Sequence, residues 1–75
     1  MKKFVIGILV SNQSGVLTRI SGMFARRGFN ISSLEVHETA DPAVSEMTIS
    51  VYGDEYIHYQ LLKQLGKLHD VISIS

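Results

Sequence analysis

The chain has 75 residues and no cysteine, so we expect one small domain without disulfides or thiolate metal sites. A chain of this size buries only roughly 60–65% of its unfolded surface, and oligomerisation is the expected source of extra stability. Seven basic and seven acidic residues give a formal net charge of zero, which argues against nucleic acid as the main partner. The first apolar run is too short to span a membrane and lacks a following cleavage site, so we expect a cytoplasmic protein with no membrane partner.

The chain opens with a strand followed by a helix. Phe4 to Val10 is almost continuously apolar and rich in β-forming residues, which is typical of a central strand. A helix from about Gly15 to Arg27 follows, ended by Gly28. The residues of its apolar stripe, which would lie on a sheet, are Val16, Ile20, Met23 and Phe24.

The turn between this strand and helix is the best functional lead. Its residues Asn12, Gln13, Ser14 and Gly15 favour turns and helix N-caps, with side chains that bond local backbone groups. The first turn of a helix leaves about four N–H groups without partners and carries positive potential. A carboxylate or phosphate can bind there, although simple capping by Asn12 and Ser14 explains the same residues equally well.

The second half repeats the pattern. Asn30 to Thr39 is predicted to be a strand with one polar face, Ala40 to Ala43 a turn, and Glu46 to Tyr52 a half-buried strand. Asp54 and Glu55 are placed to begin a second helix, and Val71 to Ile74 forms a short last strand. The apolar face of the second helix is Ile57, Leu61, Leu65 and Leu68.

The order β-α-β-β-α-β predicts an α+β sandwich, in which an antiparallel sheet carries both helices on one face. Right-handed connections place the first and third strands in the middle, and the Asn30–Thr39 strand at an edge. An exposed edge pairs readily with another chain, so we expect a homodimer through this strand.

The residues also resemble a known family. The segment from Asn12 to Leu34, with its Gly15-Val16-Leu17 and Arg26-Arg27-Gly28-x-Asn30-Ile31 motifs, is similar to the ACT domain of the acetolactate (acetohydroxyacid) synthase small subunit. The likeness continues through Asp41-Pro42, Met47-Thr48-Ile49 and Asp70-Val71-Ile72, and covers nearly the whole chain as one ACT domain, residues 1–75. The chain departs from the family at Ser14, where proline is common, and at Glu46, where a basic residue is common. It also stops at Ser75, where members usually continue into a second domain or tail, which weakens the implication of activation more than that of ligand binding.

The resemblance implies a ferredoxin-like fold, side-by-side dimers and no catalysis. It implies feedback control by a branched-chain amino acid, usually valine, and association with a thiamine-diphosphate-dependent catalytic subunit. The ligand loop would contain Asn12, Ser14, Gly15, Val16 and Leu17, and Asn30 and Ile31 would approach from the other protomer. A bulky residue at Gly15 should then abolish binding and leave the fold intact.

Other interpretations of the sequence have weaker support. Arg26 and Arg27 fit a partner-protein contact, or simply favourable charge at a helix C-terminus. His37, His58 and His69 lie on separate elements, so we expect no metal site, and nothing calls for a cofactor. The alternatives to the regulatory interpretation are a free-standing ACT domain that senses another small molecule or only dimerises, a single-stranded RNA binder of the same strand order, and an enzyme.

Overall fold

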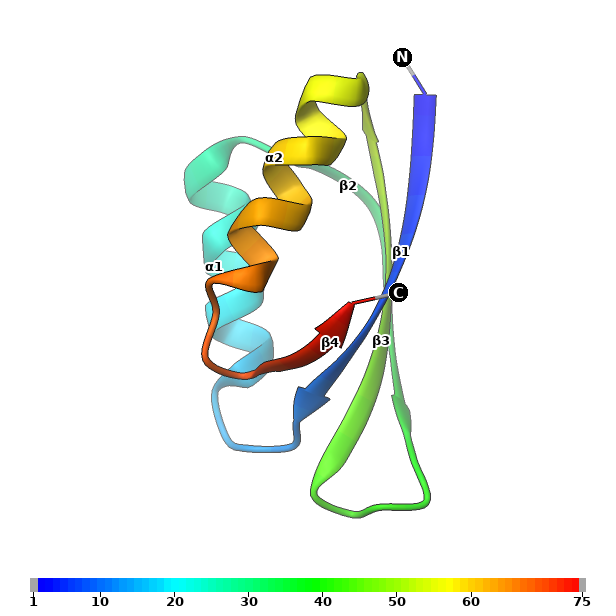
Figure 1. The fold of residues 1–75 in the computed structure, drawn as a ribbon, viewed down its shortest axis with the longest axis vertical. Helices are drawn as coiled ribbons and strands as arrows, with labels where there is room; N and C mark the ends of the chain where they lie inside the picture. Colours follow the sequence, from blue (N-terminus) through cyan, green and yellow to red (C-terminus); the bar gives the residue numbers. More distant parts are fainter. Residues whose placement is uncertain (1, 75) are drawn as a thin grey trace.

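The computed structural model describes residues 2–74 and contains the predicted order of strands and helices. Figure 1 shows one four-stranded sheet with both helices on the same face, so the predicted ferredoxin-like α+β fold is confirmed. The elements are β1 (Lys2–Ser11), α1 (Val16–Arg27), β2 (Asn30–Glu38), β3 (Val44–Gly53), α2 (Glu55–Gly66) and β4 (Val71–Ile74).

The strands are ordered β2-β3-β1-β4, and every neighbouring pair is antiparallel. The longest ladder joins β1 to β3, from Lys2 opposite Gly53 to Ser11 opposite Val44. The two central strands are therefore those predicted from the sequence, and β2 lies at an edge, also as predicted. Because β1 and β3 are held on both sides, the loop that leaves β1 starts from a well-anchored strand.

The edge strand β2 contains a local irregularity that its sequence pattern reflects. Its register against β3 shifts between Ile31 and Ser33. On either side of the shift, Ile31 pairs with Val51 and Leu34 pairs with Ile49. Val51 and Ile49 are both core residues. Such a bulge adds one residue to a strand and so lets two apolar residues three positions apart share one face.

The two helices begin in different ways. The N-cap of α1 is Gly15, with φ 87°, and no side chain in residues 2–74 caps this end. The prediction of local side-chain capping by Asn12 or Ser14 is therefore wrong, because a left-handed glycine makes the turn. In α2, Asp54 caps the helix by accepting a hydrogen bond from the N–H of Ile57 at 2.9 Å, as predicted. Gly28 ends α1 with φ 71°, also as predicted.

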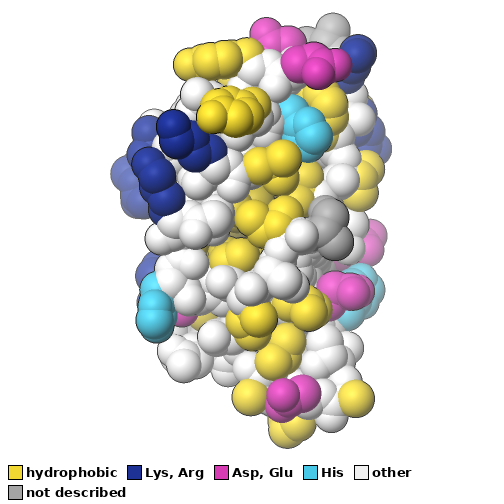
Figure 2. All heavy atoms as spheres, viewed as in Figure 1, with side chains coloured by type: hydrophobic (Ala, Val, Ile, Leu, Met, Phe, Trp, Pro, Cys, Tyr) yellow, Lys and Arg dark blue, Asp and Glu magenta, His cyan; other side chains and the backbone are white. Residues whose placement is uncertain are grey.

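Charged side chains are distributed unevenly over the surface. In the view of Figure 2, the largest group of Lys and Arg atoms lies over the helix side of the molecule. Asp and Glu atoms lie at the top, along the sheet side and at the hairpin end. The neutral sequence therefore folds into a molecule with oppositely charged regions.

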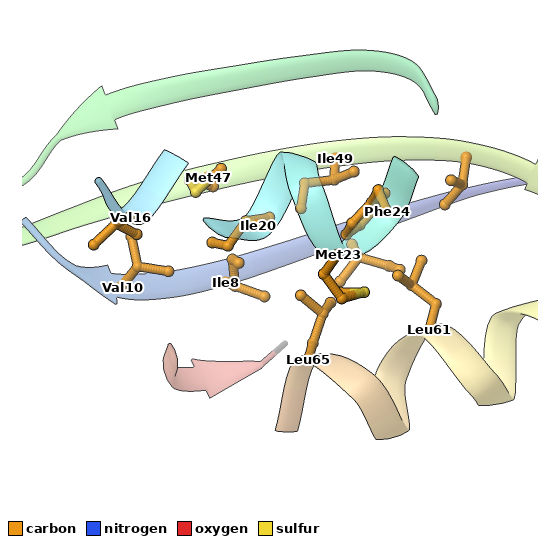
Figure 3. Close-up of a cluster of buried hydrophobic side chains, with 12 residues drawn as sticks. Ile8, Val10, Val16, Ile20, Met23, Phe24, Met47, Ile49, Leu61 and Leu65 are labelled. Atoms are coloured by element: carbon orange, nitrogen blue, oxygen red, sulfur yellow. The ribbon is translucent and has the colours of Figure 1, made fainter. Parts of the chain in front are cut away.

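The hydrophobic core lies between the sheet and the two helices (Figure 3). All four residues of the predicted α1 stripe are buried, and Leu61 and Leu65 of α2 are fully buried. The strand residues of the core are Ile6, Ile8, Val10, Met47, Ile49 and Val51. Since Val10 and Val16 are both buried, the connection between β1 and α1 is pinned to the core at each end.

Candidate functional site

A hollow of about 210 Å³ opens where β1 ends and α1 begins. Its walls come from the end of β1, the following loop, the first turn of α1 and the two strands β2 and β3. The lining residues are Val10, Ser11, Asn12, Gln13, Gly15, Val16, Leu17, Val36, Ser45 and Met47. Four predicted ligand residues, Asn12, Gly15, Val16 and Leu17, are among them.

One side of this hollow is apolar. Leu17 and Val36 line it, and each remains 48% exposed although it is a large hydrophobic residue. Ser45 occupies a buried position in phase with Met47 and Ile49, where a larger side chain would fill the space. Val36, Ser45 and Met47 were not predicted as site residues. The one sequence signal for them is a small serine at the end of the core-facing pattern of β3.

The polar side of the hollow is the N-terminus of α1. Its first turn contains no acidic residue and, within residues 2–74, receives no side-chain cap. The N–H of Val16 donates to the Gln13 carbonyl at 3.3 Å, so the following first-turn N–H groups and the positive end of the helix dipole are left for another acceptor. The N-terminus of α2 differs, because the Asp54 carboxylate occupies it and Glu55 lies in the first turn.

Asn12 ties the loop to the neighbouring hairpin. Its backbone N–H donates to the Ala43 carbonyl at 2.8 Å, and its side-chain Nδ2 donates to the Pro42 carbonyl at 3.1 Å. With the amide nitrogen engaged in this way, the side-chain oxygen of Asn12 is the acceptor that remains. Asn12 also borders a second hollow of about 190 Å³, formed by the turn of the hairpin.

An ion pair supports the other side of the loop. Arg19 Nε donates to Asp70 Oδ2 at 2.6 Å, and the Asp70 side chain is only 8% exposed. The hydrogen bond from Arg19 lowers the pKa of Asp70 below its ordinary value, and the same bond raises the pKa of Arg19. The backbone N–H of Ser11 also donates to the Asp70 carbonyl at 2.9 Å. This pair was not predicted from the sequence, because its members are 51 residues apart in the chain.

Gly15 lies beside this ion pair. A Cβ atom at Gly15 would come within 3.0 Å of Arg19 Nη1, and its φ of +87° strains any residue with a side chain. A bulky Gly15 variant should therefore strain this turn, a cost that the sequence alone did not indicate. Loss of binding in such a variant would not by itself identify a ligand contact.

The remaining predicted residues lie elsewhere. Ser14 is exposed and does not line the hollow. Asn30 and Ile31 begin β2 at the opposite end of the sheet, eight residues from Glu38, which is about 25 Å along the strand. Asn30 lines a different hollow there, together with Gly28, Phe29, Tyr52, Gly53, Asp54 and Ile57. One protomer alone does not bring the two predicted parts of the ligand site together.

Within residues 2–74, no group of three or more His, Cys, Asp or Glu side chains is arranged to hold a metal ion. No helix in the same range is long and apolar enough to cross a membrane. Arg26 and Arg27, the predicted partner contacts, are exposed in the last turn of α1.

Comparison with known proteins places this geometry in a family. The family described as the AHAS small subunit-like ACT domain matches residues 6–73, which is most of the chain. The chain belongs to this family. The resemblance found in the sequence is therefore confirmed.

Named relatives agree with the family. The chain is 48% identical over 71 residues to the acetolactate synthase isozyme 3 small subunit of Escherichia coli K12, covering 95% of this chain and 44% of that protein. It is 49% identical over 73 residues to a probable acetolactate synthase small subunit of Archaeoglobus fulgidus, covering 97% and 46%. The crystal structure of the Thermotoga maritima small subunit superimposes with a TM-score of 0.93 at 39% identity, covering all of this chain and 47% of that one. This ACT domain thus spans less than half the length of these relatives.

Proposed function

We propose that residues 1–75 form one regulatory, non-catalytic ACT domain that binds a branched-chain amino acid such as valine and acts on acetolactate synthase. The names of the relatives support the pathway, since those proteins are small subunits of that enzyme. The observation that carries the ligand assignment is the uncapped N-terminus of α1 beside an apolar hollow.

The hollow complements each part of a zwitterionic amino acid. The first-turn N–H groups of α1 would donate hydrogen bonds to the carboxylate, and the side-chain oxygen of Asn12 would accept a hydrogen bond from the ammonium group. Leu17 and Val36 would pack against a branched aliphatic side chain. The volume of about 210 Å³ lies below the 300–1,000 Å³ of ordinary ligand pockets, which suits a small ligand and a site completed by a second chain.

The second chain would be another copy, joined through the β2 edge. Antiparallel pairing of two β2 strands about a two-fold axis sets the Asn30 end of one beside the Glu38 end of the other. Glu38 pairs with Ser45, and Ser45 pairs with Val10 at the hollow. Asn30 and Ile31 of the second protomer would thereby approach the ligand that Asn12 and Leu17 contact in the first.

A calorimetric titration with valine, leucine and isoleucine tests the ligand assignment. Wild type should bind at least one of them saturably, and Ser45→Val should weaken binding at least tenfold because the added methyl groups enter the hollow. Ser50→Val is the matched control, since Ser50 is also buried in β3 and lies on the opposite face of the sheet. Its affinity should stay within about twofold of wild type, which is well under 1 kcal/mol.

Two results would contradict the proposal. If a folded dimer gives no heat with any of the three amino acids, the domain senses another molecule or only dimerises. If Ser45→Val and Ser50→Val bind equally well, the ligand lies outside this hollow.

A further inference from the structure

The formal charge of zero hides an uneven distribution of charge between the hairpin and the helices. Four of the seven acidic residues lie on the β2–β3 hairpin, and four of the seven basic residues lie on or directly after the helices with no acidic partner in residues 2–74. The acidic residues of the hairpin are Glu35, Glu38, Asp41 and Glu46. The unpartnered basic residues of the helix layer are Arg26, Arg27, Lys63 and Lys67.

The acidic residues near the helices are already engaged. Glu55 contacts Lys2 Nζ at 3.2 Å, and Asp70 contacts Arg19 Nε at 2.6 Å. Asp54 accepts a hydrogen bond from the α2 backbone. Among residues 2–74, the four basic side chains therefore have no carboxylate partner, and the helix layer presents a net positive face.

Two exposed tyrosines lie in line with two of these cations. Tyr56 is 66% exposed and Tyr59 is 60% exposed, although both carry large aromatic rings. With Lys63 and Lys67 they follow a spacing of three, four and four residues, so they form one stripe along α2. Tyrosine and arginine are among the residue types most enriched at the centres of protein interfaces, whereas lysine is more typical of rims.

Arg26 and Arg27 extend the same face onto α1. The helices run in opposite directions on the sheet, so the end of α1 lies beside the first half of α2 (Figure 1). The core agrees, because Met23 and Phe24 near the end of α1 lie close to Leu61 of α2 (Figure 3). Arg26 Nη1 lies 3.3 Å from the Cβ position of Gly22, which places its guanidinium along the surface of α1.

We propose that this basic–tyrosine face, formed by Arg26, Arg27, Tyr56, Tyr59, Lys63 and Lys67, docks an acidic surface of the acetolactate synthase catalytic subunit. The inference rests on the proposed function for the identity of the partner. The tyrosines anchor the contact, and the four cations orient the approach, with the acidic hairpin turned away from the partner's negative field. The face lies on the helices and leaves the β2 edge free for a second copy of this chain.

A protein partner fits this face better than a polyanion does. Affinity for nucleic acid comes from many phosphate contacts, whereas this face offers four cations on a molecule of zero net charge. The β2–β3 hairpin carries four acidic residues, as many as the cations of the face. It would therefore repel an extended polyanion that reached beyond the face. A compact acidic patch on a folded protein avoids that repulsion.

Binding of the purified catalytic subunit from the same organism, measured by biolayer interferometry, tests the proposal. Lys63→Glu should weaken binding about tenfold, and Tyr56→Ala/Tyr59→Ala by at least as much. The matched control is Lys3→Glu, the same reversal of an exposed lysine on the sheet, which should change affinity less than about twofold. Wild-type affinity should fall as salt rises, because the cations are solvent-exposed.

Calorimetry on the same variants separates this proposal from the effector assignment. The Lys63→Glu variant should bind the catalytic subunit more weakly and should keep wild-type affinity for the amino acid that wild type binds. If wild type binds none of the three amino acids, the effector assignment is contradicted, but the docking proposal can still be tested by binding of the catalytic subunit.

Three outcomes would overturn the docking face. The first is that wild type does not bind the catalytic subunit, and the second is that Lys63→Glu and Lys3→Glu bind it equally. The third is that the face instead binds a 20-nucleotide oligouridine or phosphatidylserine vesicles, or joins copies of this chain into larger species by light scattering.

Discussion

At the scale of single residues, Gly53 shows how a close contact constrains the sequence. A Cβ atom there would lie 2.6 Å from Ile57 Cγ2 and 2.8 Å from Ile57 Cβ. The second of these atoms is fixed to the α2 backbone, so the clash is not relieved by rotating a side chain. Gly53 is therefore required because the first turn of α2 presses on the end of β3.

Gly53→Ala should lower the free energy of unfolding by about 1–3 kcal/mol, as overpacking of a buried site does. Gly66→Ala is the matched control, because no atom lies within 4 Å of its added Cβ. Alanine is favoured over glycine in a helix, so this control should be neutral or more stable by up to about 1 kcal/mol. Urea denaturation of the two variants measures the difference, and equal midpoints would show that the contact with Ile57 is relieved by small shifts.

At the scale of elements, the two β-α-β halves are similar in outline and different in chemistry. The second half satisfies the N-terminus of its helix with its own carboxylate, Asp54. The first half uses a left-handed glycine, Gly15, and no side chain of the described residues caps that end. A helix N-terminus that the protein does not neutralise itself is the one suited to an external anion.

The ion pair between Arg19 and Asp70 joins α1 to the segment before β4, and it gives stability a defined pH dependence. The pKa of Asp70 is lowered in the folded protein, mainly by the hydrogen bond from Arg19. A lowered folded pKa means that the stabilisation is present above the unfolded pKa and is lost as the pH falls through the folded pKa. Arg19→Met should therefore lower the urea midpoint at neutral pH, because it leaves a nearly buried carboxylate without its partner.

The difference between Arg19→Met and wild type should narrow below about pH 4, where Asp70 of the unfolded chain begins to take up a proton. Lys2→Met is the control, since the Lys2–Glu55 pair is exposed on both sides and contributes little. Urea midpoints across this pH range measure both variants. A difference that is constant with pH would show that Arg19 acts through packing alone.

At the scale of the whole molecule, the charge separation sets opposite salt dependences for two associations. Each β2 edge carries Glu35 near its middle, so antiparallel pairing of two edges brings the two Glu35 charges within a Debye length of about 10 Å at 0.1 M salt. The proposed dimer should therefore tighten as salt rises from about 0.05 M to about 0.5 M, while docking of the helix face to an acidic protein should weaken.

Sedimentation equilibrium measures the dimer directly. Val36→Lys should raise its dissociation constant at least tenfold, because Val36 is half exposed on the edge strand and a charged lysine on an edge disfavours pairing with another strand. Lys63→Glu on the helix face is the control and should leave the dimer unchanged. A dimer unaffected by Val36→Lys would place the interface elsewhere on the molecule.

Much of this protein could be derived from its sequence, because its local signals agree with its global fold. The periodicity of Val16, Ile20 and Phe24 and the alternation of Met47, Ile49 and Val51 require two layers around one core. Asp54 predicts the start of its helix because an N-cap side chain bonds the N–H of a residue only three positions away. The resemblance to the ACT family came from the same residues.

Tertiary structure alone decided what depends on residues far apart in the chain. The helix cap at Gly15 required a backbone angle that no side-chain pattern specifies, and Asn12 bonds Pro42 because folding brings the hairpin to the loop. Likewise Arg19 meets Asp70, and Val36 and Ser45 reach the hollow, only once the strands are paired. The neutral composition concealed a charged helix face for the same reason: net charge is a sum over the sequence, whereas a surface potential depends on where the fold places each charge.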